Sequence, residues 1–140
     1  MQAWVIYALL AAVFAAFVWV FAKIGLGKID PALANAVRVA VLLPVMWLIV
    51  FTMGKHKGIP DIDRKALLFL VLSALATGAS WLCGFRALRD APAASVQSID
   101  KLSIVITLLI GVFIFGEALT WKAAAGAALV VAGCILLAWK

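Results

Sequence analysis

Charged residues are scarce in this chain of 140 residues. Asp, Glu, Lys and Arg together make up 13% of the sequence, whereas hydrophobic residues make up 68%. Soluble domains are about one-quarter charged and about half apolar. The composition therefore excludes an ordinary soluble domain and predicts a protein embedded in the lipid bilayer.

Cysteine and histidine, which build many metal sites and catalytic centres, are almost absent. Cys83 and Cys134 lie inside apolar segments without another Cys or His at ligand spacing, and His56 stands alone between two segments. We therefore expect no metal site, no cofactor and no enzymatic activity. The sequence does not favour a membrane enzyme that acts on lipid, because the apolar segments contain no catalytic pair that would support it.

Acidic residues are fewer than basic ones, which gives the chain a formal charge of +6. The basic residues are scattered through short loops and form no stripe, so no nucleic-acid partner is expected. The longest loop, Gly54–Arg64, leaves no room for a soluble domain. Because the first apolar segment lacks a basic flank and a cleavage site, we interpret it as a permanent helix rather than a signal peptide.

What the sequence does contain is a series of long apolar segments. An α-helix needs about 20 residues to cross a hydrocarbon core of about 30 Å. Five segments approach or exceed this length, and we predict an all-α integral membrane protein with a single five-helix domain over residues 1–140. The expected helices are 3–22, 32–53, 66–85, 91–115 and 120–139.

The predicted helix ends carry residues that are typical of caps. Asp30 precedes Pro31 at the start of the second helix, Asp61 or Asp63 can cap the third, and Thr120 can cap the fifth. Within helices, we expect structural roles for three further residues. Pro44 should kink the second helix, and Gly126 and Gly133 should let the fifth helix pack closely against another.

Five transmembrane segments place the termini on opposite sides of the membrane, and the loops then carry five basic residues on each side. Because no positive-inside bias selects one orientation, we predict dual topology and an antiparallel homodimer, whose ten helices would have inverted-repeat symmetry. Counting the intramembrane Arg38 and Lys101 would tilt the balance to seven against five. One set is Lys55, Lys57, Arg64, Lys65 and Lys122; the other is Lys23, Lys28, Arg86, Arg89 and Lys140.

Three stretches of the chain, "AKIGLGKIDPALANAVR", "GFRALRDAPAA" and "FGEALTWKAAAGAALVVAGCILL", resemble the EamA family of the drug/metabolite transporter superfamily. The resemblance covers the whole chain and is greatest to single-repeat bacterial and archaeal members. It implies a multi-pass protein of the cell (inner) membrane that moves small metabolites, often outward. Fused relatives have ten helices in two inverted halves. The resemblance does not name a substrate.

Two departures limit what the resemblance carries over. Many family members have an apolar run with a proline where this chain has "SIDKLS", so no family role passes to Asp100 or Lys101. The first helix also lacks the acidic residue of the small multidrug resistance transporters, which are distant relatives. Glu117 does match the family's Gly-Glu-x-Leu-Thr turn, and we expect it to hold that turn or to pair with Lys122.

Asp100 is the residue that most needs an explanation. Counting from Pro92 places it about 12 Å into the membrane, where a short side chain cannot reach the interface. Arg38 lies at a similar depth, so it could pair with Asp100, as could Lys101 of a partner subunit. The sequence leaves these pairings and the protonation state of Asp100 open.

Polar residues of the third and fourth helices could line a cavity at this depth. They could also form only hydrogen bonds between helices. The predicted substrate or proton site comprises Asp100, Lys101, Arg38, Trp81, Gln97, Ser103, Thr77 and Ser80.

The function predicted from the sequence is secondary transport of a small polar or amphipathic metabolite. We expect an exporter that works by alternating access at a dimer interface. The alternatives are a drug exporter like the small multidrug resistance proteins and a structural or regulatory membrane subunit that does not transport. Substrate, direction and coupling ion are not determined by the sequence.

Overall fold

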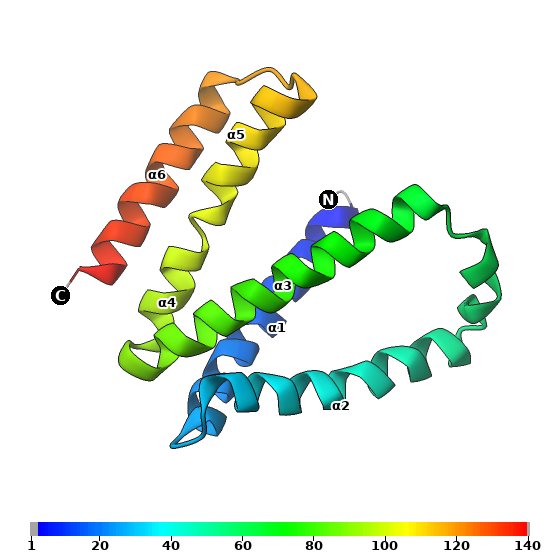
Figure 1. Cartoon of the computed structure of the whole chain (residues 1–140). Coiled ribbons are helices and arrows are strands. Elements are labelled where there is room, and N and C mark those ends of the chain that lie inside the picture. Colours follow the sequence, from blue (N-terminus) through cyan, green and yellow to red (C-terminus); the bar gives the residue numbers. More distant parts are fainter. Residues whose placement is uncertain (1–2, 140) are drawn as a thin grey trace. The chain divides into compact units, whose positions relative to one another are not determined.

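The computed structural model describes residues 3–139, and the described residues are helical with no strand. The predictions that involve residues 1, 2 and 140, including Lys140 in the charge balance, lie outside the described residues. Figure 1 shows the order of the elements along the chain. They are α1 (Ala3–Leu26), α2 (Pro31–Thr52), the 3₁₀ helix η1 (Lys55–Asp61), α3 (Arg64–Asp90), α4 (Ala93–Asp100), α5 (Ser103–Phe115) and α6 (Trp121–Ala138).

Five helical spans in the described chain are long and apolar enough to cross a membrane, as the sequence predicts. They are α1, α2, α3, the segment Ala93–Phe115 that contains α4 and α5, and α6. The third helix is longer than expected because it continues at both ends through basic residues. Long basic side chains can extend from a helix end toward the headgroups, so the additional turns remain compatible with lipid.

Local sequence explains where α2 and α6 begin. One carboxylate oxygen of Asp30 accepts hydrogen bonds from the amides of Ala32 and Leu33, at 2.8 and 3.2 Å. The Thr120 hydroxyl accepts one from the Ala123 amide at 3.2 Å. Both predicted N-caps are therefore confirmed. Each of them satisfies amides that the first turn of a helix leaves without partners.

The segment between α2 and α3 contains a 3₁₀ helix, η1, that the sequence did not predict. Gly54 has a φ of 66°, and the 3₁₀ helix η1 follows it directly. A left-handed residue of this kind ends a helix and redirects the chain, and glycine adopts it without a steric penalty. The expected loop is therefore a short, ordered connection.

The fourth span also differs from the expectation of one continuous helix over 91–115. Residues Lys101 and Leu102 form a turn that separates α4 from α5. Neither glycine nor proline lies within this turn, so the usual sequence signal for a break is missing.

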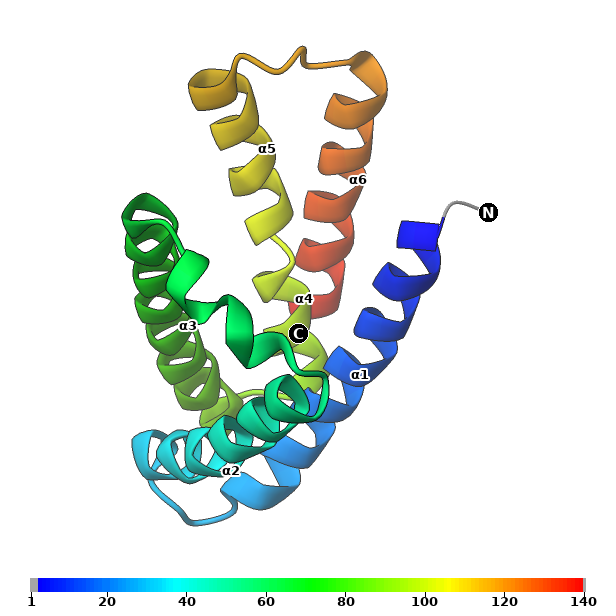
Figure 2. The same ribbon diagram turned by 90° about the vertical axis from the view of Figure 1, so that its right-hand side faces the viewer.

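The chain forms two compact units, which are described separately. The first contains residues 3–23 and 90–139, and the second contains residues 24–89. Within the first unit, α4 lies beside α6, whereas α5 diverges from α6 toward the loop that joins them (Figures 1 and 2). Val96 and Cys134 are buried in this unit. In the second unit, the aromatic side chain of Phe85 is buried on α3.

Candidate functional site

The break between α4 and α5 places Asp100 at the end of a helix inside the fourth span, rather than within one continuous helix. Asp100 is the last residue of α4, and Lys101 is the first residue of the turn. Both side chains are exposed. Within the described part of its own unit, the Asp100 carboxylate forms no hydrogen bond or ion pair. Within this unit, the carboxylate oxygens are therefore available to accept hydrogen bonds.

The hydrogen bonds across the break span three residues, as in a 3₁₀ helix, instead of the four residues of an α-helix. The amides of Leu102 and Ile104 donate to the carbonyls three residues earlier, at 2.9 and 3.0 Å. Among residues 3–139, no backbone bond across the break uses the Asp100 carbonyl or the Ser103 amide. Unpaired backbone groups at membrane depth require water, protein or a bound solute. The break thus adds a free carbonyl and a free amide to the Asp100 carboxylate.

Contacts with α6 hold α4 in place just before the break. The Cys134 thiol donates to the Ser98 carbonyl at 2.8 Å, and the Ser95 hydroxyl donates to the Leu137 carbonyl at 3.2 Å. The Lys23 ammonium of α1 donates to the Ala91 carbonyl at 2.9 Å, ahead of α4. Side chains of α6 and α1 therefore bind backbone groups on both sides of the α4 N-terminus.

A second polar feature lies in the other unit, between α2 and α3. The guanidinium carbon of Arg38 lies 4.1 Å from the centre of the Trp81 ring and 5.7 Å from that of Phe85. Both distances are within the range of cation–π attraction. The structure therefore brings together Arg38 and Trp81, two of the predicted site residues, and adds Phe85 to them.

The predicted pairing of Arg38 with Asp100 stays a prediction, because these residues belong to different units. Gln97 is partly buried on α4, and Ser103 is exposed at the start of α5. On α3, Ser80 is exposed, and the Thr77 hydroxyl donates to the Ser73 carbonyl of its own helix at 2.9 Å. The Thr77 hydroxyl therefore satisfies its donor within α3, and it can still accept a hydrogen bond.

Glu117 takes part in the turn that ends α5. Gly116 has a φ of 66°, and the amides of Gly116 and Glu117 both donate to the Gly111 carbonyl. A β-carbon added to Gly111 would lie 2.7 Å from a carboxylate oxygen of Glu117. The side chain thus folds back onto α5 at a position where glycine leaves room for it. This geometry agrees with a role in holding the turn.

The other residues with expected structural roles lie in ordinary helical positions. Pro44 lies inside α2, which is continuous on both sides of it. A β-carbon added to Gly126 or Gly133 of α6 would meet no atom within 4 Å. Their predicted role in close helix packing therefore stays a prediction, since no such contact is made within their own unit.

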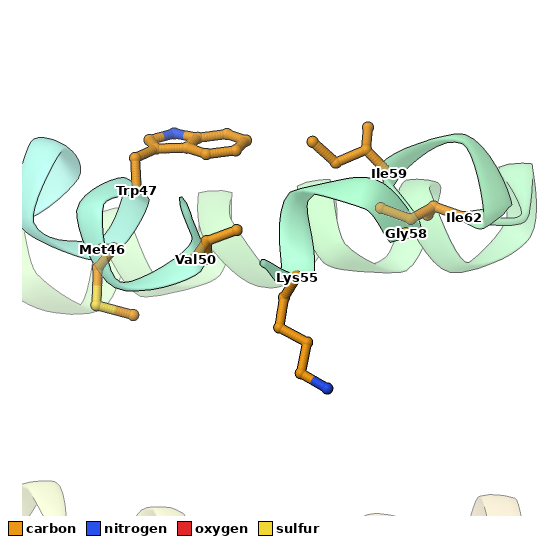
Figure 3. Close-up of a pocket in the computed structure, with 7 residues that line it drawn as sticks. All are labelled: Met46, Trp47, Val50, Lys55, Gly58, Ile59 and Ile62. Atoms are coloured by element: carbon orange, nitrogen blue, oxygen red, sulfur yellow. The ribbon is translucent and has the colours of Figure 1, made fainter. Parts of the chain in front are cut away.

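A shallow apolar pocket of about 330 Å³ lies where α2 meets η1 (Figure 3). Trp47 and Ile59 lie on one side of it, whereas the Lys55 side chain points away from them. Only one lining side chain is charged. A pocket of this composition suits a lipid chain better than a polar solute, and it contains none of the predicted site residues. Its lining is Met46, Trp47, Val50, Lys55, Gly58, Ile59 and Ile62.

Sequence reasoning missed two residues, Phe85 and Asn35, that share helix faces with predicted site residues. Trp81 and Phe85 are four residues apart, a spacing that places them on one face of a helix, so this signal was present. Asn35 and Arg38 are three residues apart on α2 and share a face in the same way. The contact between Cys134 and Ser98 had no comparable signal, because it joins residues 36 positions apart.

These observations define a multi-pass membrane protein with polar groups inside its spans, and no group of three or more metal-ligating residues occurs in residues 3–139. The chain belongs to the EamA-like transporter family, whose model matches residues 2–139. A protein of Sinorhizobium sp. called "Uncharacterized transporter in cobO 3'region" is 45% identical over 137 residues, which cover 98% of this chain and 97% of that protein. No solved structure matches the chain. The protein is thus a membrane transporter by family, not a member of an enzyme family.

Proposed function

We propose that the protein is a secondary transporter that exports a small polar or amphipathic metabolite across a bacterial or archaeal inner membrane. The observation that carries the proposal is the broken fourth span, with the free Asp100 carboxylate at the break. In many secondary transporters, discontinuous helices supply substrate and ion sites near the middle of the membrane. The family and the transporter named in Sinorhizobium sp. support the same class of function.

The proposed mechanism is alternating access between two antiparallel copies. Five spans give one copy an odd number of helices, and two copies of opposite orientation would form the inverted pair found in many transporters. The equal distribution of basic residues between the loops supports insertion in both orientations. Asp100 of each copy would then flank one shared cavity. The carboxylate would alternate between a proton and the solute as the cavity opens to either side.

Proton-driven flux in proteoliposomes tests the role of Asp100. Labelled probes that are neutral, cationic and anionic would be offered with and without an imposed proton gradient. Asp100→Asn should reduce gradient-driven flux of the transported probe by roughly tenfold or more, since the group can no longer bind and release a proton. Asp63→Asn is the matched control, because Asp63 lies outside the spans. Undiminished and still pH-dependent flux in Asp100→Asn would contradict the proposed coupling.

The orientation of the chain is tested by C-terminal reporter fusions. The wild type should give signals on both sides of the membrane, as expected for dual topology. Replacing Lys55 and Lys57 by Gln should shift the balance, because it removes two basic residues from one set of loops. The matched control replaces Arg86 and Arg89 by Gln, and it should shift the balance in the opposite direction. A wild-type signal on one side only would overturn dual topology.

A further inference from the structure

We propose that Arg38, backed by the rings of Trp81 and Phe85, binds the carboxylate of a monoanionic solute. This inference rests on the proposed transport function and deepens it, because it names a substrate class. The guanidinium carbon lies over Trp81 at 4.1 Å and near Phe85 at 5.7 Å. The aromatic contacts fix the position of the cation but use none of its hydrogen-bond donors.

The charge of Arg38 is not compensated within its unit. Arg38 forms no hydrogen bond or ion pair with a described residue of the second unit. Its guanidinium has five N–H donors in a rigid fork. Because a charged residue at membrane depth is unfavourable unless it is satisfied, an arginine with no anionic partner in its own unit is a candidate functional site. An anionic group of a solute would supply both the charge and the acceptors.

The charge balance favours a monoanion. Arg38 is the only charged residue of α2, and α3 has none between Ala66 and Phe85. One carboxylate neutralises one guanidinium and can accept two parallel hydrogen bonds from it. A phosphate dianion would leave a net negative charge in apolar surroundings, which is unfavourable.

A buried polar neighbour supports a binding role on the same side of α2. Asn35 lies three residues before Arg38, which places the two side chains on one face of the helix. Its side chain is only 6% exposed, and its amide oxygen has no hydrogen-bond partner in the described chain. Buried polar atoms are almost always hydrogen-bonded, so the unpaired oxygen indicates a missing partner. An amide oxygen only accepts, so this partner is an N–H or O–H donor elsewhere on the solute and not its carboxylate.

The surface beside Trp81 has room for the body of a solute. Gly78 lies three residues before Trp81 on α3, and a β-carbon added there would meet no atom within 4 Å. The side chains next to this position are apolar or aromatic, apart from the Thr77 hydroxyl. The expected ligand is therefore a small carboxylate with an apolar body.

The test compares carboxylates with carboxamides of the same shape. The probes are phenylacetate and phenylacetamide, 4-methylpentanoate and 4-methylpentanamide, with phenethylamine as the cationic probe. Binding is measured by thermal shift and calorimetry on the full chain in a phosphate-free maltoside detergent. At least one carboxylate should bind roughly tenfold more tightly than its carboxamide, a difference typical of one charged hydrogen-bonded pair.

Variants then assign the preference to Arg38. Arg38→Gln should lose it, and Arg38→Lys should keep only part of it, because Lys has the charge without the planar fork. Arg86→Gln is the matched control on the same unit and should behave as the wild type. Should Arg38→Gln not fold, the wild-type preference and the Arg38→Lys comparison decide. Equal binding of carboxylates and carboxamides, or an unchanged preference in Arg38→Gln, would overturn the inference.

Two further arms separate this inference from its alternatives. Adding phosphatidylglycerol tests a lipid source: Arg38-dependent stabilisation by this lipid, and by no soluble carboxylate, overturns the inference in favour of a headgroup site. Flux of the same probes is measured in proteoliposomes. If a neutral or cationic probe moves and no carboxylate binds, the inference is wrong and transport stands. If carboxylates bind through Arg38 and no probe moves, the site stands and the proposed transport is wrong.

Discussion

The two halves of the fourth span differ in how they are held. The first half, α4, lies against α6, and its Ser98 and Val96 side chains are buried. The second half, α5, diverges from α6 and is connected to it mainly through the Gly116 turn (Figure 2). Asp100 lies at the boundary. If α5 moves while α4 stays against α6, the surroundings of the Asp100 carboxylate change although its own helix does not move. A gated site requires a change of this kind.

The largest expected difference between the two halves is in amide hydrogen exchange. The amide of Ser103 has no backbone partner across the break. The amides of Leu102 and Ile104 donate to carbonyls only three residues earlier, as in a 3₁₀ helix. Residues 101–105 should therefore exchange about a hundredfold faster than the amides in the last turn of α4, because local opening needs less free energy there. Exchange measured by mass spectrometry on protein in nanodiscs checks this. Equal protection on both sides would mean that the break does not weaken the span.

The connection of α5 to α6 is the next point to test. Gly116→Val should destabilise the protein by about 2 kcal/mol, because a β-branched residue is strongly disfavoured at a φ of 66°. The measurement is unfolding of the detergent-solubilised protein. Gly126→Ala is the control, since Gly126 is helical and a β-carbon there meets open space. It should leave one copy unchanged or slightly more stable. If Gly126→Ala lowered the stability of a dimer and not that of the single copy, a partner subunit would pack against α6.

The contact between α4 and α6 predicts a smaller effect. Cys134→Ala should lower stability by about 1 kcal/mol, because it removes the thiol that donates to the Ser98 carbonyl and leaves a small void in a buried position. The same unfolding measurement on Cys83→Ala is the control, since Cys83 is exposed. Equal effects of the two substitutions would show that the contact at Ser98 does not fix α4.

The smallest expected effect distinguishes the two halves by a matched pair of serines. Ser95→Ala removes a hydrogen bond to the Leu137 carbonyl, and it should lower the free energy of unfolding by about 0.6 kcal/mol, as is usual for such bonds in membranes. Ser103→Ala, beyond the break, should change nothing, because its exposed hydroxyl makes no bond with a described residue.

The same contrast explains which parts of the fold could be predicted. Helix number, the Asp30 and Thr120 caps and the membrane class depend on local composition, and local composition is visible in the sequence. The sequence predicts that α3 ends at residue 85, because the basic residues that follow are typical of a loop, but these residues continue the helix to Asp90. The break at Lys101 was missed because its sequence contains no glycine or proline. Its three-residue hydrogen bonds follow from the backbone conformation at the turn, which no particular residue type announces.

The candidate site divides in the same way. Asp100 and Arg38 were found because charges inside apolar segments stand out, and Trp81 was found by counting depth along helices. Phe85 and Asn35 were missed although they lie on the same faces as Trp81 and Arg38. The polar residues Thr77 and Ser103 were placed in one lining by sequence reasoning. The structure shows that Thr77 bonds its own helix and that Ser103 begins a new one.

By itself, the sequence determined that this protein has five segments long and apolar enough to cross a membrane and that it belongs with the EamA-like transporters. Hydrophobic length and cap residues act locally, and no distant contact is needed to interpret them. Only the tertiary structure decided that the fourth span divides at Asp100, that Cys134 reaches the Ser98 carbonyl, and that the Arg38 cation lies on Trp81 and Phe85. These features join residues on different helices, and their geometry depends on packing that no single segment specifies.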